Sequence, residues 1–163
     1  MDASAPFIFQ ALEQSALGLA IRQSVWVYPA ANIGHVLAVM VFAGVIAVMD
    51  VRLAGAFPAT AARVVVGRAR LAAVAAFAVI AVTGLIMFTA EASHLALNRV
   101  FQIKLLLILL GLLNVVAFQI AFGSAIEKTP AGVKLPDAVR YSAIASLGIW
   151  LLVAACGRSI AYF

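Results

Sequence analysis

The sequence has few charges, and acidic residues are especially scarce. Of its 163 residues, six are Asp or Glu and eleven are Lys or Arg, whereas 66% are hydrophobic. Soluble domains are roughly 45–50% apolar, and a soluble domain of this size could not cover its surface with so few charges. The basic residues are too scattered to follow a phosphate backbone, which excludes a nucleic-acid binder. We therefore expect one integral membrane domain over residues 1–163, in contact with the lipid bilayer.

Cysteine and histidine are almost absent. Cys156 is the single cysteine, which excludes an intrachain disulfide. The sequence shows no hydrolase triad, phosphate loop, zinc signature or pair of catalytic carboxylates, so hydrolytic enzymes and ATP-driven transporters are disfavoured. Asp2 and Glu13 stand in the first twenty residues without a basic segment, so no cleavable leader is expected. The sequence favours a protein that is not an enzyme.

Long apolar runs dominate what remains. A membrane-spanning helix needs about 20 mostly apolar residues, and four stretches qualify. Backbone groups in hydrocarbon must be satisfied within their own segment, so the runs should be helices, whereas barrel strands would be shorter and would alternate. The predicted fold is an all-α bundle of four transmembrane helices, over residues 25–49, 70–90, 100–122 and 138–158.

The residues around these spans predict where they end. Asp50 and Arg52 close the first span, and Asp137 stands where an N-cap of the fourth helix is expected. Residues 7–23 predict a short interfacial helix on the outer membrane surface, with a loosely structured leader as the alternative. Its apolar residues recur at helical spacing: Ile8, Leu12, Ala16 and Leu19.

Basic residues predict the orientation, because cytoplasmic connections carry an excess of Lys and Arg. The connections after the first and third spans hold seven of the eleven: Arg52, Arg63, Arg68, Arg70, Lys128, Lys134 and Arg140. We therefore expect a multi-pass protein of a bacterial inner membrane, with both termini in the periplasm.

His35 is the deepest histidine. It lies about 15 Å into the first span at 1.5 Å per residue. Tyr28, Asn32 and His35 follow at i, i+4 and i+7, so they share one helix face, which we expect to point into the bundle. A neutral imidazole can bind a metal or haem iron or relay protons. It can equally be a structural histidine bonded to a neighbouring helix, and both readings stay open.

The second span carries a similar stripe. Thr83, Met87, Ala90 and His94 recur at helical spacing, and Glu91 adjoins them. His94 lies at or beyond the outer boundary, roughly 10–15 Å in depth from His35 by the helical rise. This gap disfavours a haem held by both histidines, although a metal site using His94 remains an alternative.

The third and fourth spans add further candidates. Lys104 can snorkel to the outer surface, pair with Glu91 or serve as a ligand-binding charge. Asn114 can bond His35 or a backbone carbonyl. Arg158 can anchor the last helix or bind an anionic ligand. Five glycines are expected to allow close helix approach: Gly34, Gly44, Gly84, Gly111 and Gly148.

Several short motifs occur together along the chain. They are Leu12-Glu13, Ile21-Arg22, Tyr28-Pro29, His35, Asp50-Val51-Arg52-Leu53, Thr83-Gly84-Leu85, Asn98, Phe101-Gln102-Ile103-Lys104-Leu105, Gly111, Asn114, Gly157-Arg158 and Ile160-Ala161-Tyr162. This pattern resembles a family of small uncharacterised bacterial inner-membrane proteins with four spans. It is loosely similar to the membrane core of the copper-resistance D proteins. That second resemblance implies copper handling and maps only to His35 and Lys104, and the expected periplasmic segments rich in methionine and histidine are absent.

Three functional hypotheses follow. The first is a ligand-binding or redox-accessory module with an outward-facing intramembrane site around His35 for a metal, haem or quinone. The second is a copper-translocating protein that uses His35 with methionines such as Met40 and Met87. The third is a structural subunit of a larger membrane complex. Haem b and copper are the cofactors considered, and a homo-oligomer or a larger complex is the partner considered.

Overall fold

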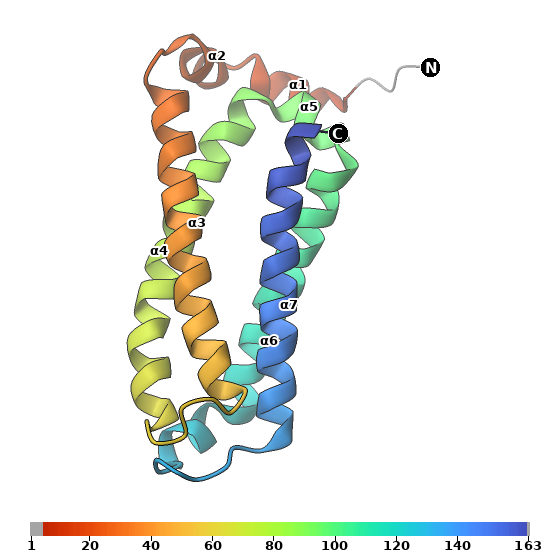
Figure 1. Ribbon diagram of the computed structural model, residues 1–163. Coiled ribbons are helices and arrows are strands. Elements are labelled where there is room, and N and C mark those ends of the chain that lie inside the picture. Colours follow the sequence, from red (N-terminus) through yellow and green to blue (C-terminus); the bar gives the residue numbers. More distant parts are fainter. Residues whose placement is uncertain (1–4, 163) are drawn as a thin grey trace.

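The computed structural model describes residues 5–162, and every secondary-structure element in that range is helical (Figure 1). Four long helices run side by side, and short helices cover one end of them. The elements are α1 (Phe7–Glu13), α2 (Ala16–Gln23), α3 (Val27–Leu53), α4 (Ala62–Ala90), α5 (Ala92–Leu97), α6 (Arg99–Lys128), α7 (Asp137–Ser159) and the 3₁₀ turn η1 (Ile160–Tyr162).

The four long helices confirm the predicted all-α fold with four spans. Each is long and apolar enough to cross a membrane, with a mean hydropathy between 1.7 and 2.6 over its most apolar window. Most of their large apolar side chains face outward rather than into the bundle. Such a surface is stable against hydrocarbon and not against water. The chain is therefore a multi-pass membrane protein whose outer face contacts the lipid bilayer.

Three of the predicted helix boundaries were wrong. Helix α3 continues through Asp50 to Leu53, because these polar residues are buried against protein rather than exposed. Helix α4 begins at Ala62, so the arginines assigned to a connection stand on its first turns. Asp137 is the first residue of α7, and Pro136 takes the N-cap position without a side-chain cap. Proline is well suited to the start of a helix because its φ angle is already helical.

The segment predicted as one interfacial helix is two helices. Helices α1 and α2 are separated at Gln14 and Ser15, and the Ser15 hydroxyl accepts a hydrogen bond from the Gly18 N–H at 3.1 Å. A serine cap of this kind begins a new helix. Gly18 has no room for a Cβ, which would lie 2.5 Å from the Glu13 carbonyl oxygen. The chain therefore turns between α1 and α2 instead of continuing straight.

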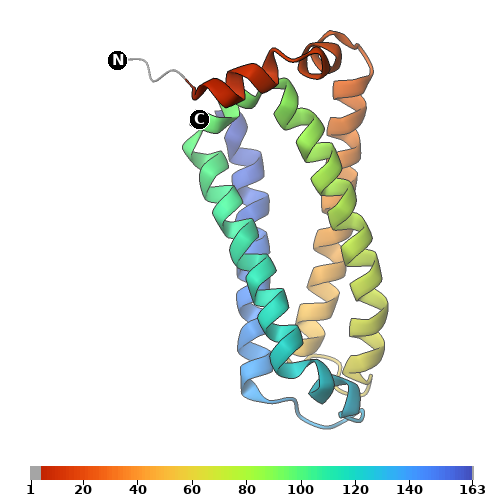
Figure 2. The same cartoon turned by 180° about the vertical axis from the view of Figure 1, so that it is seen from behind.

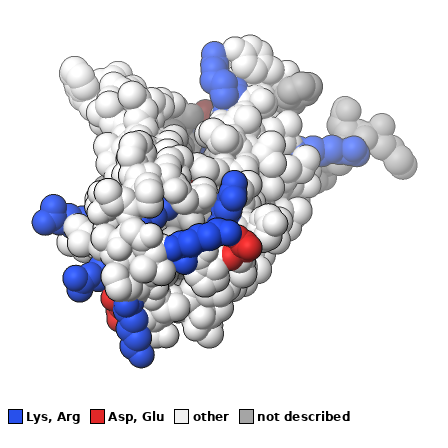
Figure 3. Space-filling model, turned by 60° about the horizontal axis from the view of Figure 1, so that its bottom comes forward, with Lys and Arg blue, Asp and Glu red and all other residues white. Residues whose placement is uncertain are grey.

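The long helices form two antiparallel hairpins, α3 with α4 and α6 with α7. The hairpins meet mainly through α3 and α7, whereas α4 and α6 touch much less (Figure 2). A hydrogen bond from Arg70 Nη1 to Gln119 Oε1, at 2.9 Å, closes the seam between α4 and α6. In both views the hairpins lie closest at the end that holds the α3–α4 and α6–α7 connections. We call it the basic end, because lysine and arginine side chains gather there (Figure 3).

The buried core is concentrated toward the basic end. One cluster lies at that end, and a second lies further along the bundle around Phe42, beneath the His35 region. Their buried members are Leu53, Ala62, Ile126, Leu135, Val139 and Ala143 in the first, and Phe42, Ile46, Ala73 and Ala76 in the second. Small alanines let helix backbones approach closely, which is how helices associate in lipid.

Trp150 of α7 contacts all three other long helices. Its ring lies edge-on to Phe42 of α3 at 4.7 Å and to Phe77 of α4 at 6.1 Å between centroids. Its six-membered ring also covers Gly111 of α6, where a Cβ would lie 2.9 Å from Trp150 Cζ2. One aromatic side chain thus joins both hairpins in the middle of the bundle, with Gly111 making the necessary space.

The other glycines predicted to allow close approach divide into two groups. Gly84 lies against the ring of His35, where a Cβ would be 3.3 Å from Cε1, and Gly34 is in ordinary contact range of Thr83. Gly44 and Gly148 have nothing within 4 Å of a Cβ position, so the prediction was wrong for them. Both of these face away from neighbouring helices.

We expect Gly111→Ala to lower the free energy of unfolding by about 1–3 kcal/mol, because the added methyl pushes the Trp150 ring out of its site. Gly148→Ala is the matched control, and it should be neutral or stabilising by up to about 1 kcal/mol because it meets no neighbour. Thermal unfolding in detergent, followed by circular dichroism, measures both. Equal effects of the two changes would contradict the role given to Gly111.

The Glu13 side chain joins the short helices α1, α2 and α5 to one another. Its carboxylate accepts hydrogen bonds from the Ser93 backbone N–H of α5 at 2.8 Å and from Arg22 Nη1 of α2 at 2.9 Å. These bonds, the Ser93 bond foremost, hold the pKa of the Glu13 carboxyl below its ordinary value of 4.5. Phe9 of α1 adds an edge-on contact to Phe88 of α4.

The hydrogen bonds of Glu13 with Ser93 and Arg22, which we call the Glu13 clasp, should weaken in acid. Because the folded pKa is lowered, the stabilisation is complete above about pH 4.5 and is lost as the pH falls through the folded value. Hydrogen exchange should show the amide protection of residues 7–23 decreasing over that acidic range. In Glu13→Gln, the amide protection of residues 7–23 should be weak at every pH. If the variant instead shows the same pH profile as the parent protein, the Glu13 hydrogen bonds do not hold these helices.

Candidate functional site

His35 and Thr83 form a polar contact between α3 and α4. The His35 Nδ1 atom lies 3.0 Å from the Thr83 hydroxyl oxygen, and both side chains are half-buried. The Nδ1–Cε1 edge of the ring faces α4, since Cε1 and Nδ1 lie 3.3 and 3.7 Å from the Cβ position of Gly84. Gly84 therefore gives the imidazole its space, and Thr83 holds it in one orientation.

The direction of this hydrogen bond follows from the other bond of Thr83. Its hydroxyl donates to a carbonyl of its own helix, that of Val79 at 2.6 Å. With its one hydrogen on the Val79 carbonyl, the hydroxyl oxygen can accept from His35, which corresponds to the tautomer with the proton on Nδ1. In that tautomer the neutral ring leaves Nε2 with a lone pair. An imidazole fixed through one nitrogen in this way presents the other as a ligand atom.

Lys104 of α6 stands in the same half of the bundle as His35, since each lies within the first ten residues of its long helix. It is half-buried and crosses to α7, where its Nζ lies 3.4 Å from the Cβ position of Gly157. The structure contains no ion pair between Lys104 and Glu91 within residues 5–162, so that predicted pairing was wrong. The helix break at Glu91 leaves its carboxylate exposed. Lys104 is thus a basic side chain of the second hairpin that lies against α7, in the half of the bundle that also holds the His35 imidazole.

The sequence predicts that Tyr28, Asn32 and His35 of α3 all point into the bundle, and the structure agrees for two of the three. Tyr28 and His35 are half-buried, and Glu91 is the charged neighbour of the Tyr28 hydroxyl. Asn32 is exposed, so its predicted inward position was wrong. The small side chain of Ala31, 6% exposed, occupies the packed position instead, because it allows closer helix approach.

His94 lies outside this region. The helix breaks at Glu91, so His94 stands on α5 as an exposed residue and does not continue the stripe that Thr83 and Met87 form on α4. Within residues 5–162 no group of three or more His, Cys, Asp or Glu side chains lies close enough to hold a metal ion. Met40 is 65% exposed on the outer face of α3. A haem or metal held by both histidines therefore finds no support in the geometry.

Asn114 bonds to a backbone carbonyl, which is one of the two partners predicted for it, and not to His35. Its Nδ2 donates to the Ser142 carbonyl of α7 at 3.3 Å, and the Ser142 hydroxyl donates to Asn114 Oδ1 at 3.0 Å. The two bonds tie α6 to α7, so Asn114 holds the second hairpin together rather than bonding His35. Interhelical bonds of this kind commonly join membrane helices.

Arg158 is occupied by its own helix end. It donates to the Tyr162 hydroxyl at 2.7 Å, and its guanidinium lies 5.0 Å from the centre of the Tyr162 ring. Both side chains are exposed. Anchoring of the last helix and binding of an anionic ligand therefore both stay predictions for Arg158.

Asp50 is a buried carboxylate that sequence reasoning placed at a helix end. Only 2% of it is exposed, Ser146 of α7 lies beside it, and its Oδ2 atom has no hydrogen-bond partner within residues 5–162. An ionisable group inside a membrane bundle is a functional candidate by default. The signal that could have found this region is the i, i+4, i+8 spacing of Ser142, Ser146 and Trp150 on one face of α7.

These features define a small all-helical multi-pass membrane protein with polar side chains at separate depths of the bundle. The chain matches the family of unknown function DUF6644 over residues 8–163 and belongs to that family. No curated protein and no solved structure matches the chain significantly.

A double-mutant cycle tests the bond between α6 and α7. We expect Asn114→Leu and Ser142→Ala each to cost about 0.6–1.7 kcal/mol of unfolding free energy, and the double variant to cost less than their sum because they remove a shared bond. Ser159→Ala serves as the control, since its hydroxyl bonds only the Ala155 carbonyl of its own helix. Strict additivity between positions 114 and 142 would contradict the contact.

Proposed function

We propose that the chain is a ligand-binding, redox-accessory module of the membrane, with its site around His35. The observation that carries the proposal is the imidazole held at Nδ1 by Thr83; with the proton on Nδ1, Nε2 is an acceptor atom inside a membrane bundle. The hydrogen bond therefore serves as the positioning contact, and Nε2 serves the ligand.

Haem and quinone are the ligand classes that suit this pair of groups. Haem iron accepts one axial imidazole nitrogen, and an ammonium group can pair with a propionate. A quinol hydroxyl can donate to Nε2, while its second oxygen accepts from Lys104. A bare metal ion is less well served, because protein sites for transition metals commonly use three or four ligands and the described residues hold no such cluster. Copper translocation accordingly stands second.

The orientation follows from the distribution of charge. We propose that the basic end lies in the cytoplasm of a bacterial inner membrane, because seven of the eleven basic residues lie on or near the α3–α4 and α6–α7 connections. His35 and Lys104 then lie in the outer half of the membrane. A ligand could reach them laterally between α4 and α6, where the hairpins touch least.

The test is to purify the chain in mild detergent, record its absorption spectrum, and extract quinones and metals. We expect a Soret band or a stoichiometric quinone in the parent and in His94→Ala, and its loss in His35→Ala. His94→Ala is the matched control because His94 is exposed on α5.

Three other outcomes would overturn the proposal. Copper retained by the parent and lost in His35→Ala would instead support translocation. A blank spectrum and blank extracts, together with a His35→Ala variant as stable as the parent, would leave no role for the imidazole. Co-purification of a stoichiometric protein partner with no bound ligand would favour a structural subunit.

A further inference from the structure

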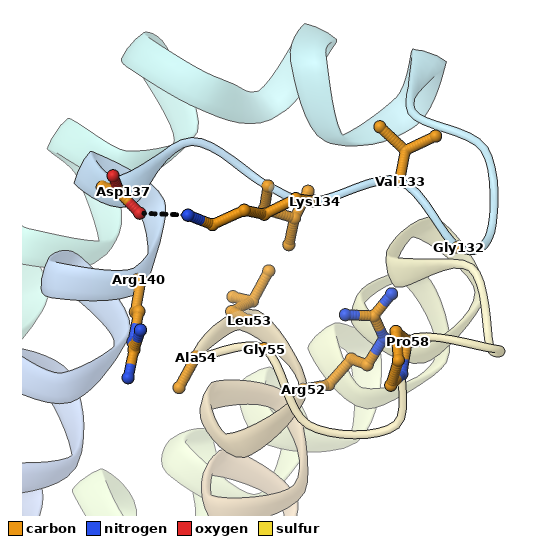
Figure 4. Close-up of a pocket in the computed structure, with 11 residues that line it drawn as sticks. Arg52, Leu53, Ala54, Gly55, Pro58, Gly132, Val133, Lys134, Asp137 and Arg140 are labelled. Carbon is orange, nitrogen blue, oxygen red and sulfur yellow. Dashed lines mark ion pairs between the residues drawn. The ribbon is translucent and has the colours of Figure 1, made fainter.

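The basic end contains a cavity of about 470 Å³ between the two connections. It is lined by residues of α3, of the α3–α4 connection, of the α6–α7 connection and of α7 (Figure 4). A hydrogen bond from the Gly132 N–H to the Pro58 carbonyl, at 2.8 Å, ties the two connections together across it. Ligand pockets commonly occupy about 300–1,000 Å³, so the volume suits a small molecule or headgroup.

The charges that line the cavity are mostly positive. Three cations and one carboxylate face it: Arg52, Lys134, Arg140 and Asp137. Lys134 Nζ pairs with Asp137 Oδ1 at 3.3 Å, which leaves the two arginines without a carboxylate partner within residues 5–162. Arg52 and Arg140 stand on opposite sides of the cavity, with Leu53 and Gly55 between them (Figure 4).

Arg52 is a buried cation that the fold holds in place. Only 4% of it is exposed, and its Nε donates to the Thr60 carbonyl at 2.8 Å. Its two terminal amino groups make no hydrogen bond within residues 5–162. Neither amino group is fully buried, so both keep contact with solvent at the cavity. The site therefore has unused donors fixed at the wall of a cavity, and an anion would satisfy them.

We propose that this cavity binds a phosphate group, either the phosphodiester of an anionic lipid or a free phosphate. Arginine is well suited to phosphate because its planar fork can make two parallel hydrogen bonds. The first turn of α7, which lines the cavity at Asp137, adds the positive end of a 23-residue helix. Leu53, Val133 and Leu135 supply an apolar wall beside the charges. This site lies at the opposite end of the bundle from His35 and functions independently of it.

Two measurements on the full chain distinguish the two sources of phosphate. In uncharged detergent micelles, thermal unfolding is titrated with inorganic phosphate against chloride at equal ionic strength. In nanodiscs of phosphatidylcholine with added phosphatidylglycerol, the phosphatidylglycerol retained through purification is counted by native mass spectrometry. A saturable phosphate response identifies a free anion, and retained phosphatidylglycerol without that response identifies a lipid headgroup; either supports the site.

The variants locate the binding. Arg140→Gln should weaken phosphate affinity or lipid retention about tenfold, as expected for the loss of a charged hydrogen bond. Arg68→Gln removes the same charge at the same end but does not line the cavity, so it should bind as the parent does. Arg52→Lys keeps the charge but loses the planar guanidinium, so it should also weaken phosphate affinity or lipid retention about tenfold. It replaces Arg140→Gln as the test if Arg140→Gln does not fold.

The proposal is overturned by any of three results. The first is a parent that shows neither a saturable phosphate response nor retained phosphatidylglycerol. The second is an equal loss in Arg68→Gln and Arg140→Gln, which would indicate a diffuse surface charge. The third is full binding in both Arg140→Gln and Arg52→Lys.

Discussion

The packing of Trp150 over Gly111 is the contact on which the arrangement of the four spans depends. In lipid, apolar surface alone does not draw helices together, so close packing and a few interhelical bonds must do so. The Trp150 ring reaches Phe42 of α3, Phe77 of α4 and Gly111 of α6 from its position on α7. It therefore joins the two hairpins at mid-depth. Toward the basic end they are packed by a buried apolar cluster, and toward the other end they separate.

This division places different chemistry at the two ends. The packed end carries buried charges, because the two connections enclose Arg52 and its cavity. The other end carries the imidazole of His35 and the ammonium of Lys104 on separate hairpins, below the clasp that Glu13 forms with Ser93 and Arg22.

The four spans could be predicted from the sequence because a run of about 20 apolar residues has few alternatives in a membrane. The helix ends could not, since Asp50 and Arg52 look like interfacial charges until the α7 and loop residues that bury them are known. His35 was recognisable as an intramembrane ionisable residue, but its partner Thr83 lies 48 positions away. Trp150 resembled one more apolar residue, because its role depends on three other helices.

The protonation pattern of His35 tests the site most directly. Nitrogen-15 NMR of the chain in bilayers resolves both imidazoles, and His94→Gln assigns the remaining signals to His35. The hydrogen bonds of Thr83 predict a proton on Nδ1 and none on Nε2, with the Nδ1 signal changing in Thr83→Val. A neutral ring with its proton on Nε2 and a bare Nδ1 would contradict this arrangement and remove the basis for a ligand at Nε2.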